Sequence, residues 1–118
     1  MNTFIEYPKC TTCQKAKKCL IENQVVFTSR HIKDERLTVE ELRTLWQQSG
    51  LPLKSFFNTS GMKYRELDLK HKLPQMDETS QLELLASDGM LVKRPILVVG
   101  NQVLVGYKAE PYKRLLKK

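Results

Sequence analysis

The first 32 residues change their apolar pattern twice, and this order restricts the fold more than any other feature of the sequence. Residues 2–7, NTFIEY, alternate apolar and polar side chains as a strand does, and Pro8 ends this strand. Residues 10–24 then carry apolar side chains at helical spacing, and residues 25–32, VVFTSRHI, favour a second strand. Because a helix connects them, the two strands are predicted to pair in parallel.

The middle of the chain is predicted to be helical. Its segments are a helix over residues 37–50, short helical turns within residues 51–74, and a helix over residues 77–89. Thr38 and Glu41 have the spacing of a capping box, and Gly50 suits the end of that helix. Asp77 is the expected N-cap of the last helix, and Gly89 is its expected end.

The apolar pattern changes again near the end of the chain. Residues 95–99, PILVV, and residues 102–107, QVLVGY, are apolar runs on either side of Gly100–Asn101, which predicts a hairpin. Residues 108–118 favour a final helix. The hairpin adds antiparallel strands to the parallel pair, so a mixed α/β sheet is expected.

Taken in order, these elements predict one architecture. A strand, a helix, a strand, a helical stretch, a hairpin and a helix match a thioredoxin-like core with an inserted helical subdomain at approximately residues 33–93. A length of 118 residues suits a single domain, residues 1–118, and leaves no room for two.

Charge and composition limit the possible partners. The net charge of +7 would suit an anionic partner, but the lysines are spread along the chain and no RNA-binding or zinc-finger spacing occurs. We therefore expect a solvated basic surface and no direct sequence-specific nucleic-acid binding. The longest apolar run, residues 95–99, is too short to span a bilayer, so no membrane association is expected. Because the first residues do not resemble a signal peptide, the chain is expected in the cytoplasm, where thiols stay reduced.

Cys10 and Cys13 form a C-x-x-C where the first strand gives way to the first helix. Unpaired backbone N–H groups and the positive end of the helix dipole stabilise an anion at this point. Cys10 is therefore predicted to have a lowered pKa and to act as a thiolate nucleophile. Cys13 lies one helical turn further on and is predicted to resolve a mixed disulfide or sulfenate formed on Cys10.

A zinc site and a chance arrangement are the alternatives to redox chemistry for this cysteine pair. A zinc site needs further ligands, and the candidates, Cys19, His31 and His71, do not have paired spacing. A clustered pair in a reducing compartment is typically redox-active or metal-binding. Because further metal ligands with paired spacing are missing, redox chemistry is favoured over a zinc site. Cys19 lies at the flank of the apolar helix face and is predicted to be a packing residue.

Arg94 and Pro95 precede the first strand of the hairpin. A proline at the start of a strand cannot donate a ladder hydrogen bond, so its position carries meaning. In a thioredoxin-like core, Pro95 would lie beside the cysteine pair, and its bond to Arg94 is a candidate for the cis form. Arg94 would then bring a permanent charge that holds an oxyanion or stabilises the Cys10 thiolate. A surface arginine before a strand is the alternative.

Three segments of the sequence resemble the arsenate reductase family and its Spx-type relatives. They are YPKCTTCQKAKK at residues 7–18, SGLPLKSFFNTSGMKYREL at residues 49–67, and LVKRPILVVGNQVLVGYKAE at residues 91–110. The resemblance implies a thioredoxin-like core with an inserted helical subdomain. It implies that a cysteine matching Cys10 attacks arsenate, that three arginines hold the oxyanion, and that a small thiol or glutaredoxin-type partner completes the reduction. Spx-type members keep a C-x-x-C switch and bind the C-terminal domain of the RNA polymerase α-subunit.

The sequence departs from the reductase pattern at two of the three arginines. Arg94 has a match, whereas the other two arginines would fall near Ser60 and near Gly106. Each lost charge-assisted contact costs roughly 1.5–3 kcal/mol, so arsenate is not expected to be the main substrate. The expected anion pocket lies beside Cys10, Cys13 and Arg94 and contains Thr11, Thr12, Ser60 and Pro95.

Two hypotheses on function follow from these residues and from the resemblance. The first is a cytosolic thiol–disulfide oxidoreductase that uses Cys10, Cys13 and Arg94. It needs no bound cofactor and takes electrons from an external thiol such as glutathione, glutaredoxin or thioredoxin. The alternative is an Spx-type redox-sensing regulator that binds the C-terminal domain of the RNA polymerase α-subunit.

Overall fold

The structure, a computed structural model, describes residues 2–116 and has the predicted order of elements. Its strands are β1 (Thr3–Glu6), β2 (Thr28–His31), β3 (Ile96–Val99) and β4 (Gln102–Val105). Its α-helices are α1 (Thr11–Glu22), α2 (Val39–Ser49), α3 (Met62–Glu66), α4 (Leu69–Lys72), α5 (Glu78–Ser87) and α6 (Ala109–Leu116). Short 3-10 turns are η1 (Leu53–Phe56), η2 (Leu73–Gln75) and η3 (Gly89–Leu91). The last two residues of the helix predicted over 108–118 lie outside the described residues.

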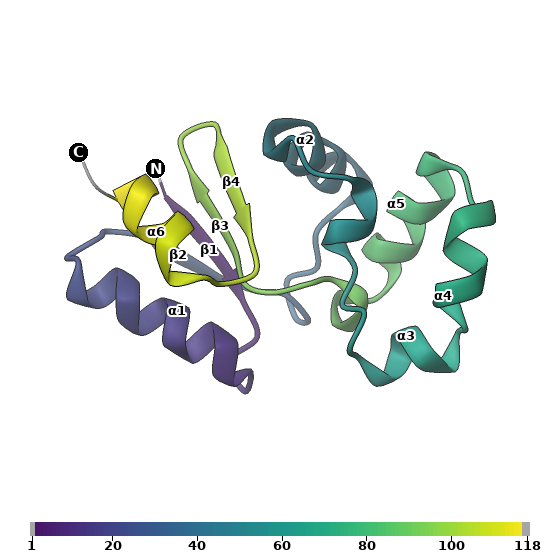
Figure 1. The fold of residues 1–118 in the computed structure, drawn as a ribbon, viewed down its shortest axis with the longest axis horizontal. Helices are drawn as coiled ribbons and strands as arrows, with labels where there is room; N and C mark the ends of the chain where they lie inside the picture. Colours follow the sequence, from purple (N-terminus) through teal and green to yellow (C-terminus); the bar gives the residue numbers. More distant parts are fainter. Residues whose placement is uncertain (1, 117–118) are drawn as a thin grey trace.

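One four-stranded sheet in the order β2-β1-β3-β4 organises the molecule. β1 and β2 are parallel, whereas β1 pairs with β3 and β3 with β4 in antiparallel fashion, which confirms the predicted mixed sheet. Figure 1 shows α1 and α6 packed on one side of this sheet and α2 to α5 gathered beyond its other side. This is the predicted thioredoxin-like arrangement, with the helices α2 to α5 inserted between β2 and β3.

The two faces of the sheet carry two separate hydrophobic cores. Adjacent residues of a strand point to opposite faces, so Phe4 and Ile5 of β1 belong to different cores. Phe4 joins the cluster beneath α1 and α6, which consists of Phe4, Ala16, Leu20, Leu97 and Tyr112. Ile5 joins the larger cluster that the helices α2 to α5 build. Each fully buried large side chain contributes about 1.5–3 kcal/mol to folding, so both helical layers are firmly attached to the sheet.

The predicted ends of the helical segments are largely confirmed. Thr38 and Glu41 form the capping box at the start of α2, and Gly50 ends that helix with φ of 70°. The Asp77 side chain accepts a hydrogen bond from the backbone N–H of Ser80 and caps α5 as predicted. Among residues 2–116, no helix has the length and apolar character needed to cross a membrane.

β2 is shorter than the strand predicted over residues 25–32, and that prediction was wrong at residues 25–27 and at Ile32. The N–H of Val25 donates to the carbonyl of Leu20 at 3.0 Å, so Val25 lies in the turn that follows α1, while Val26 is 86% exposed. Phe27 packs edge-on against Phe4 with ring centroids 5.7 Å apart. The apolar residues before β2 therefore serve the turn and the core rather than strand pairing.

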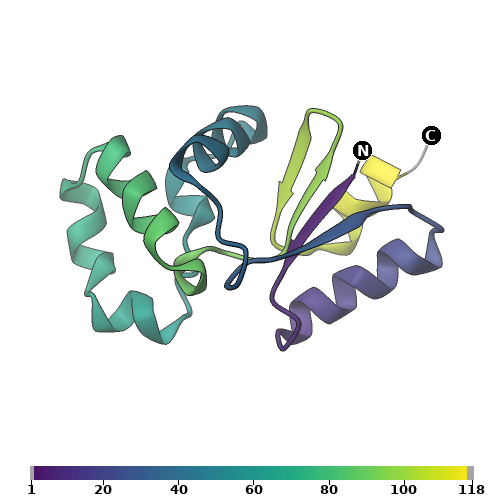
Figure 2. The ribbon, with the colours of Figure 1, turned by 180° about the vertical axis from the view of Figure 1, so that it is seen from behind.

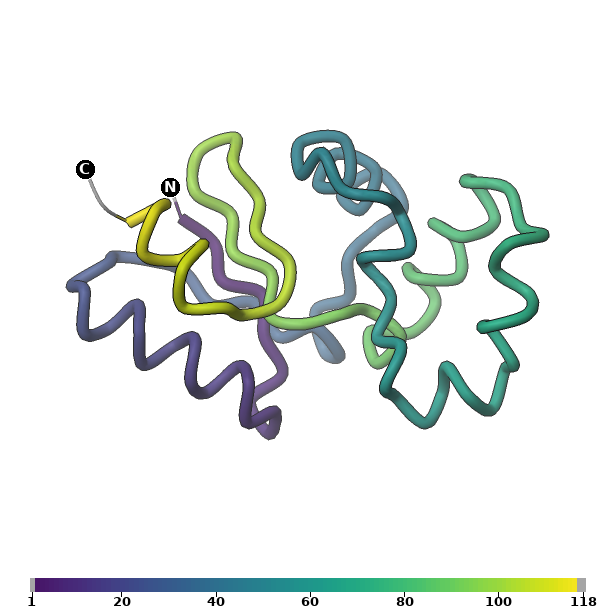
Figure 3. Tube along the Cα trace, in the orientation of Figure 1, coloured from purple at the N-terminus to yellow at the C-terminus, as the bar shows by residue number. Residues whose placement is uncertain are grey.

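Gly89 was predicted to end the helix over residues 77–89. That prediction was wrong, because α5 ends at Ser87 and Gly89 begins η3. An added Cβ at Gly89 would lie 2.1 Å from the carbonyl oxygen of Ile32 and 3.0 Å from the Cα of Lys33. The segment that follows β2 and the segment that leads to β3 are thus in direct backbone contact. Figure 2, seen from behind, and the tube in Figure 3 show these two connections running close together between the sheet and the helices. Glycine is required here because the two backbones leave no room for a side chain.

The substitution Gly89→Ala is expected to lower the free energy of unfolding by about 2–4 kcal/mol, because backbone atoms have to move to admit the methyl group. Gly50→Ala is the matched control. It adds the same methyl at φ of 70° with no heavy atom within 4 Å, so only about 1–2 kcal/mol of backbone strain is expected. Urea unfolding followed by circular dichroism measures both values, and equal losses would contradict the close contact at Gly89.

Candidate active site at the start of helix α1

Cys10 occupies the N-cap position of α1, directly after the turn that follows β1. Its backbone N–H donates to the carbonyl of Tyr7 at 2.9 Å, and its carbonyl accepts from the N–H of Gln14 at 3.0 Å. The Cys10 side chain makes no capping hydrogen bond with its thiol, although a polar N-cap side chain usually accepts one. The first N–H groups of α1 therefore face a sulfur that becomes a good acceptor only when it is ionised.

The environment of Cys10 favours that ionised form. Partial burial by itself raises the pKa of Cys10. The backbone N–H and the thiol of Cys13, the backbone N–H of Thr12 and the Arg94 guanidinium each stabilise the Cys10 thiolate, and together they outweigh burial, so the pKa of Cys10 lies below its ordinary value of 9.0. A larger share of Cys10 is consequently thiolate at neutral pH than in an unstructured peptide.

Cys13 has the opposite properties although it lies on the same helical turn. Its side chain is completely buried, and this burial is the main cause that raises the pKa of Cys13 to about 12. A charge on Cys10 adds to the increase, whereas the backbone N–H of Tyr7 and the charge of Arg94 oppose it. Both cysteines are free thiols, and each one shifts the pKa of the other. The two sulfurs thus differ in ionisation and in access to solvent.

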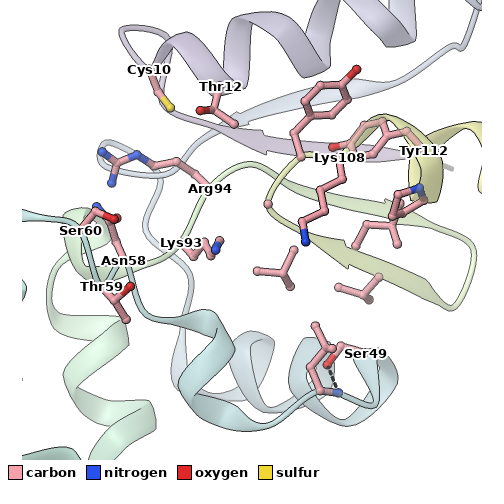
Figure 4. Close-up of a pocket in the computed structure, with 17 residues that line it drawn as sticks. Cys10, Thr12, Ser49, Asn58, Thr59, Ser60, Lys93, Arg94, Lys108 and Tyr112 are labelled. Atoms are coloured by element: carbon pink, nitrogen blue, oxygen red, sulfur yellow. Dashed lines mark hydrogen bonds between the residues drawn. The ribbon is translucent and has the colours of Figure 1, made fainter. Parts of the chain in front are cut away.

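Arg94 reaches this pair from the segment before β3. The Arg94–Pro95 bond is cis, in agreement with the prediction, and Gly106 donates to the carbonyl of Pro95 at 2.8 Å. The guanidinium lies 5.2 Å from the centre of the Tyr7 ring, and its Nη1 donates to the carbonyl of Met90 at 3.4 Å. Figure 4 shows the guanidinium between Cys10 and Ser60. Arg94 is therefore placed to touch an anion that approaches Cys10.

A short antiparallel bridge aligns Arg94 with the loop before α3. Phe57 and Val92 form the bridge, with hydrogen bonds from Asn58 N–H to Leu91 at 2.8 Å and from Lys93 N–H to the carbonyl of Phe56 at 2.8 Å. The chain therefore enters and leaves the helices α3 to α5 at adjacent positions. Because of this pairing, residues 58–60 lie on the helical side of the opening next to Cys10 (Figure 4).

An open cavity of about 610 Å³ lies between the sheet and the helices. Four of the predicted site residues line it, namely Cys10, Thr12, Ser60 and Arg94. The other three, Thr11, Cys13 and Pro95, do not line it, and of these Cys13 lies buried behind Cys10. The structure thus brings one half-buried thiol, one guanidinium and several hydroxyl groups to the same opening.

Two cationic residues at this cavity were not predicted from the sequence. Lys93 and Lys108 also line the cavity, and Figure 4 shows both amino groups directed into it. Lys93 extends across the sheet end, so that its Cε lies 3.0 Å from where a Cβ on Gly106 would be. Among the cavity-lining residues of the described chain, no aspartate or glutamate balances these charges. The cavity is therefore lined by three cationic side chains, Lys93, Arg94 and Lys108, and not only by the one arginine that matches the pattern of the reductases.

The described residues contain no cluster of metal ligands, and the third cysteine, Cys19, lies apart from the cavity. Within residues 2–116, no group of three or more His, Cys, Asp or Glu side chains is placed to hold a metal ion. Cys19 is half-buried against the core beneath α6, and the side-chain Nδ2 of Asn23 donates to its sulfur at 3.7 Å. Cys19 thus occupies a packing position on α1, away from the cavity.

The fold and this site together define a thioredoxin-like protein with a C-x-x-C at the start of its first helix. The chain belongs to the ArsC family, whose model matches residues 5–115. The Bacillus subtilis protein YusI is 56% identical over 110 residues, which are 93% of each chain. The regulatory protein MgsR of the same organism is 33% identical over 98% of this chain and 90% of its own. A solved structure of an ArsC family related protein from Bacteroides fragilis has a TM-score of 0.93 and 54% identity, and the match covers 97% of this chain and 96% of that one.

The substitution Arg94→Ala is expected to raise the pKa of Cys10, because it removes a charged donor to the thiolate. The thiolate fraction at pH 7 should then fall, and with it the rate of alkylation of Cys10 by iodoacetamide, by a factor on the order of three to ten. Above the pKa of Cys10 in both proteins the rates should converge. Peptide mass spectrometry across a pH series measures the rate for each cysteine.

Arg94→Lys is the control for charge without the guanidinium fork, and an intermediate alkylation rate is expected. Cys13 should remain almost unmodified throughout the neutral range because its pKa is about 12 and its side chain is buried. An unchanged pH profile for Cys10 in Arg94→Ala would contradict the contact between the guanidinium and the sulfur.

Proposed function

We propose that this chain is a thiol–disulfide oxidoreductase that acts on anionic substrates. The observation that carries the proposal is the opposite tuning of two neighbouring thiols. Cys10 is accessible and its pKa is lowered, whereas Cys13 is buried and its pKa is raised. Such a pair suits two successive roles. The Cys10 sulfur attacks first, and the Cys13 sulfur reacts only after a mixed disulfide has made the Cys10 sulfur electrophilic.

The reaction proceeds in two exchanges. The Cys10 thiolate attacks one sulfur of a substrate disulfide, a bond forms between the two sulfurs, and the other half of the substrate leaves as a thiol. Cys13 then attacks the Cys10 sulfur, which forms the Cys10–Cys13 disulfide and releases the second half of the substrate. An external thiol, for which glutathione, glutaredoxin and thioredoxin are the candidates, reduces the protein disulfide. A reducing compartment such as the cytosol supplies such donors.

The charges around the cavity favour an anionic substrate. Lys93, Arg94 and Lys108 surround the approach to Cys10 without an acidic residue among the described lining residues. The volume of about 610 Å³ is in the range of sites for organic ligands and exceeds the needs of one inorganic oxyanion. A disulfide that carries carboxylates therefore fits the cavity better than arsenate alone.

Turnover with two matched disulfides tests this proposal. Lys93→Ala and Lys108→Ala are each expected to raise the KM for the dianionic 3,3′-dithiodipropionate about tenfold, because one charge-assisted contact is lost. The KM for neutral bis(2-hydroxyethyl) disulfide should change little. Equal effects on both substrates would show that the lysines do not select charge.

Cysteine variants separate the two exchanges. Cys10→Ser should abolish turnover, and Cys13→Ser should stop after the first exchange with the substrate half retained on Cys10, which intact-protein mass spectrometry detects. Cys19→Ser is the control and should keep turnover because Cys19 lies outside the cavity. Arsenate turnover that survives Cys13→Ser and is lost in Arg94→Ala would instead favour an arsenate reductase.

A redox-sensing regulator is the second candidate function, and it is favoured by the 33% identity to the regulatory protein MgsR over nearly the whole chain. In this case the Cys10–Cys13 disulfide is the signal and a partner protein is the output. The resemblance to Spx-type proteins suggests the C-terminal domain of the RNA polymerase α-subunit as that partner. A pull-down with this domain, using reduced protein, oxidised protein and Cys10→Ser, is expected to show binding that depends on the disulfide. Absence of binding in every form would remove this candidate.

A further inference from the structure

The cavity beside Cys10 reaches both faces of the sheet. Val103 and Val105 of β4 line it, and both pack in the core that the helices α2 to α5 build. Leu104 and Tyr112 also line it, although both pack in the core beneath α1 and α6 on the opposite face. A cavity touches both faces of a sheet only beyond an edge or an end of its strands. Because the lining continues along β4, the last strand in the order β2-β1-β3-β4, the cavity follows the free edge of this strand.

The hydrogen bonds of the hairpin determine which backbone groups of β4 point toward this edge. The N–H of Gly106 donates to the carbonyl of Pro95 at 2.8 Å, so these two residues form a hydrogen-bonded pair. Hydrogen-bonded and non-hydrogen-bonded pairs alternate along antiparallel strands. Leu104 is consequently bonded to β3, whereas Val103 and Val105 turn their N–H and C=O groups away from it. Within the described part of the chain, these four groups have no other hydrogen-bond partner.

This row of unpaired backbone groups is suited to bind an extended peptide. An exposed edge strand accepts a further strand through main-chain hydrogen bonds. Val103 and Val105 are two residues apart, so an added strand of about three residues is long enough to pair with both. The strand at the other edge of the sheet, β2, does not line the cavity. The free edge beside the reactive thiol is therefore that of β4.

The charges at the end of β4 indicate what kind of peptide this edge binds. Lys93 and Lys108 direct their amino groups into the cavity (Figure 4), and the Cε of Lys93 lies 3.0 Å from where a Cβ on Gly106 would be. Among the described lining residues, no aspartate or glutamate offsets these charges. A strand added to β4 passes these cations, so an acidic segment is favoured. A second copy of this chain is disfavoured, because each copy has a net charge of +7.

We propose that β4 binds an extended acidic segment of a protein substrate as an additional strand, and that this pairing presents a disulfide of the substrate to Cys10. The inference rests on the proposed oxidoreductase function and specifies its substrate class. The segment pairs with the outward backbone groups of Val103 and Val105, and its carboxylates contact Lys93 and Lys108. The Cys10 thiolate then bonds to one sulfur of the substrate disulfide, and the other sulfur leaves as a thiolate that takes a proton from water.

Amide hydrogen exchange tests the pairing on the reduced full-length chain. The probe is an eight-residue peptide of alternating glutamate and valine at millimolar concentration, which has no cysteine and so requires no redox step. The N–H groups of Val103 and Val105 are expected to exchange roughly tenfold more slowly with the peptide, because a bonded N–H has to open before it exchanges. Leu104 is the internal control, since its N–H is already bonded to β3 and should change little. Unchanged exchange at both valines would overturn the proposal.

Two modified peptides separate backbone pairing from charge. N-methylation of every residue removes the backbone donors and keeps the carboxylates, whereas replacement of every glutamate by glutamine keeps the donors and removes the charge. Each change is expected to raise the Kd roughly tenfold or more in isothermal titration calorimetry. An N-methylated peptide that binds as tightly as the unmodified one would overturn the pairing with β4. A glutamine peptide with unchanged Kd would overturn the preference for acidic segments.

Turnover of bis(2-hydroxyethyl) disulfide distinguishes failure of this inference from failure of the proposed function. Turnover of this small disulfide without peptide binding would overturn the role of β4 and leave the oxidoreductase proposal intact. Peptide binding without turnover of any disulfide would instead overturn the oxidoreductase function, and with it the presentation of a disulfide to Cys10. A dimer in analytical ultracentrifugation that excludes the peptide would show that a second copy covers β4, and would overturn the proposal in favour of that occupant.

Discussion

The hydrogen bonds that the start of α1 offers to the Cys10 sulfur are the interaction on which the rest of the site depends. β1 and the turn at Tyr7 deliver Cys10 to the N-cap, where backbone N–H groups lack carbonyl partners. Burial opposes ionisation of this thiol, and the N–H groups of Thr12 and Cys13 help to reverse that effect. The fold thus lowers the pKa of a thiol with backbone N–H groups that any helix start has, and the sequence decides that a cysteine sulfur meets them.

The inserted helices supply the other half of the site. The bridge between Phe57 and Val92 holds the start and the end of this region together, so the loop before α3 and the segment before β3 meet opposite Cys10. Lys93 and Arg94 then enter the cavity from one strand of this bridge. The insertion is therefore part of the site, since Asn58, Thr59 and Ser60 line the cavity from its side while Lys93 and Arg94 follow at its end.

Local patterns in the sequence were sufficient for the elements, the mixed sheet and the position of Cys10. Periodicity indicates where a helix starts, and the capping box at Thr38 and Glu41 follows from spacing alone. Contacts between distant segments were not predictable in this way. In the sequence, Gly89 resembled a helix end. Its actual role, the close approach to the backbone of Ile32, depends on how two distant connections cross and leaves no local pattern. Lys108 lies 98 residues from Cys10 and resembled any solvated lysine, since only the folded chain shows that both line one cavity.

In the proposed oxidoreductase cycle, the raised pKa of Cys13 constrains the reduction of the protein disulfide as well as its formation. An external thiol reaches the half-buried Cys10 and not the buried Cys13, so reduction of the protein disulfide must expel the Cys13 sulfur. Burial, the main cause that raises the pKa of Cys13, also acts on this leaving sulfur and makes it a poorer leaving group, because leaving ability falls as the pKa rises. Donors that stabilise the Cys13 thiolate therefore assist both directions of exchange. The backbone N–H of Tyr7 gives the buried sulfur that assistance without exposing it to water.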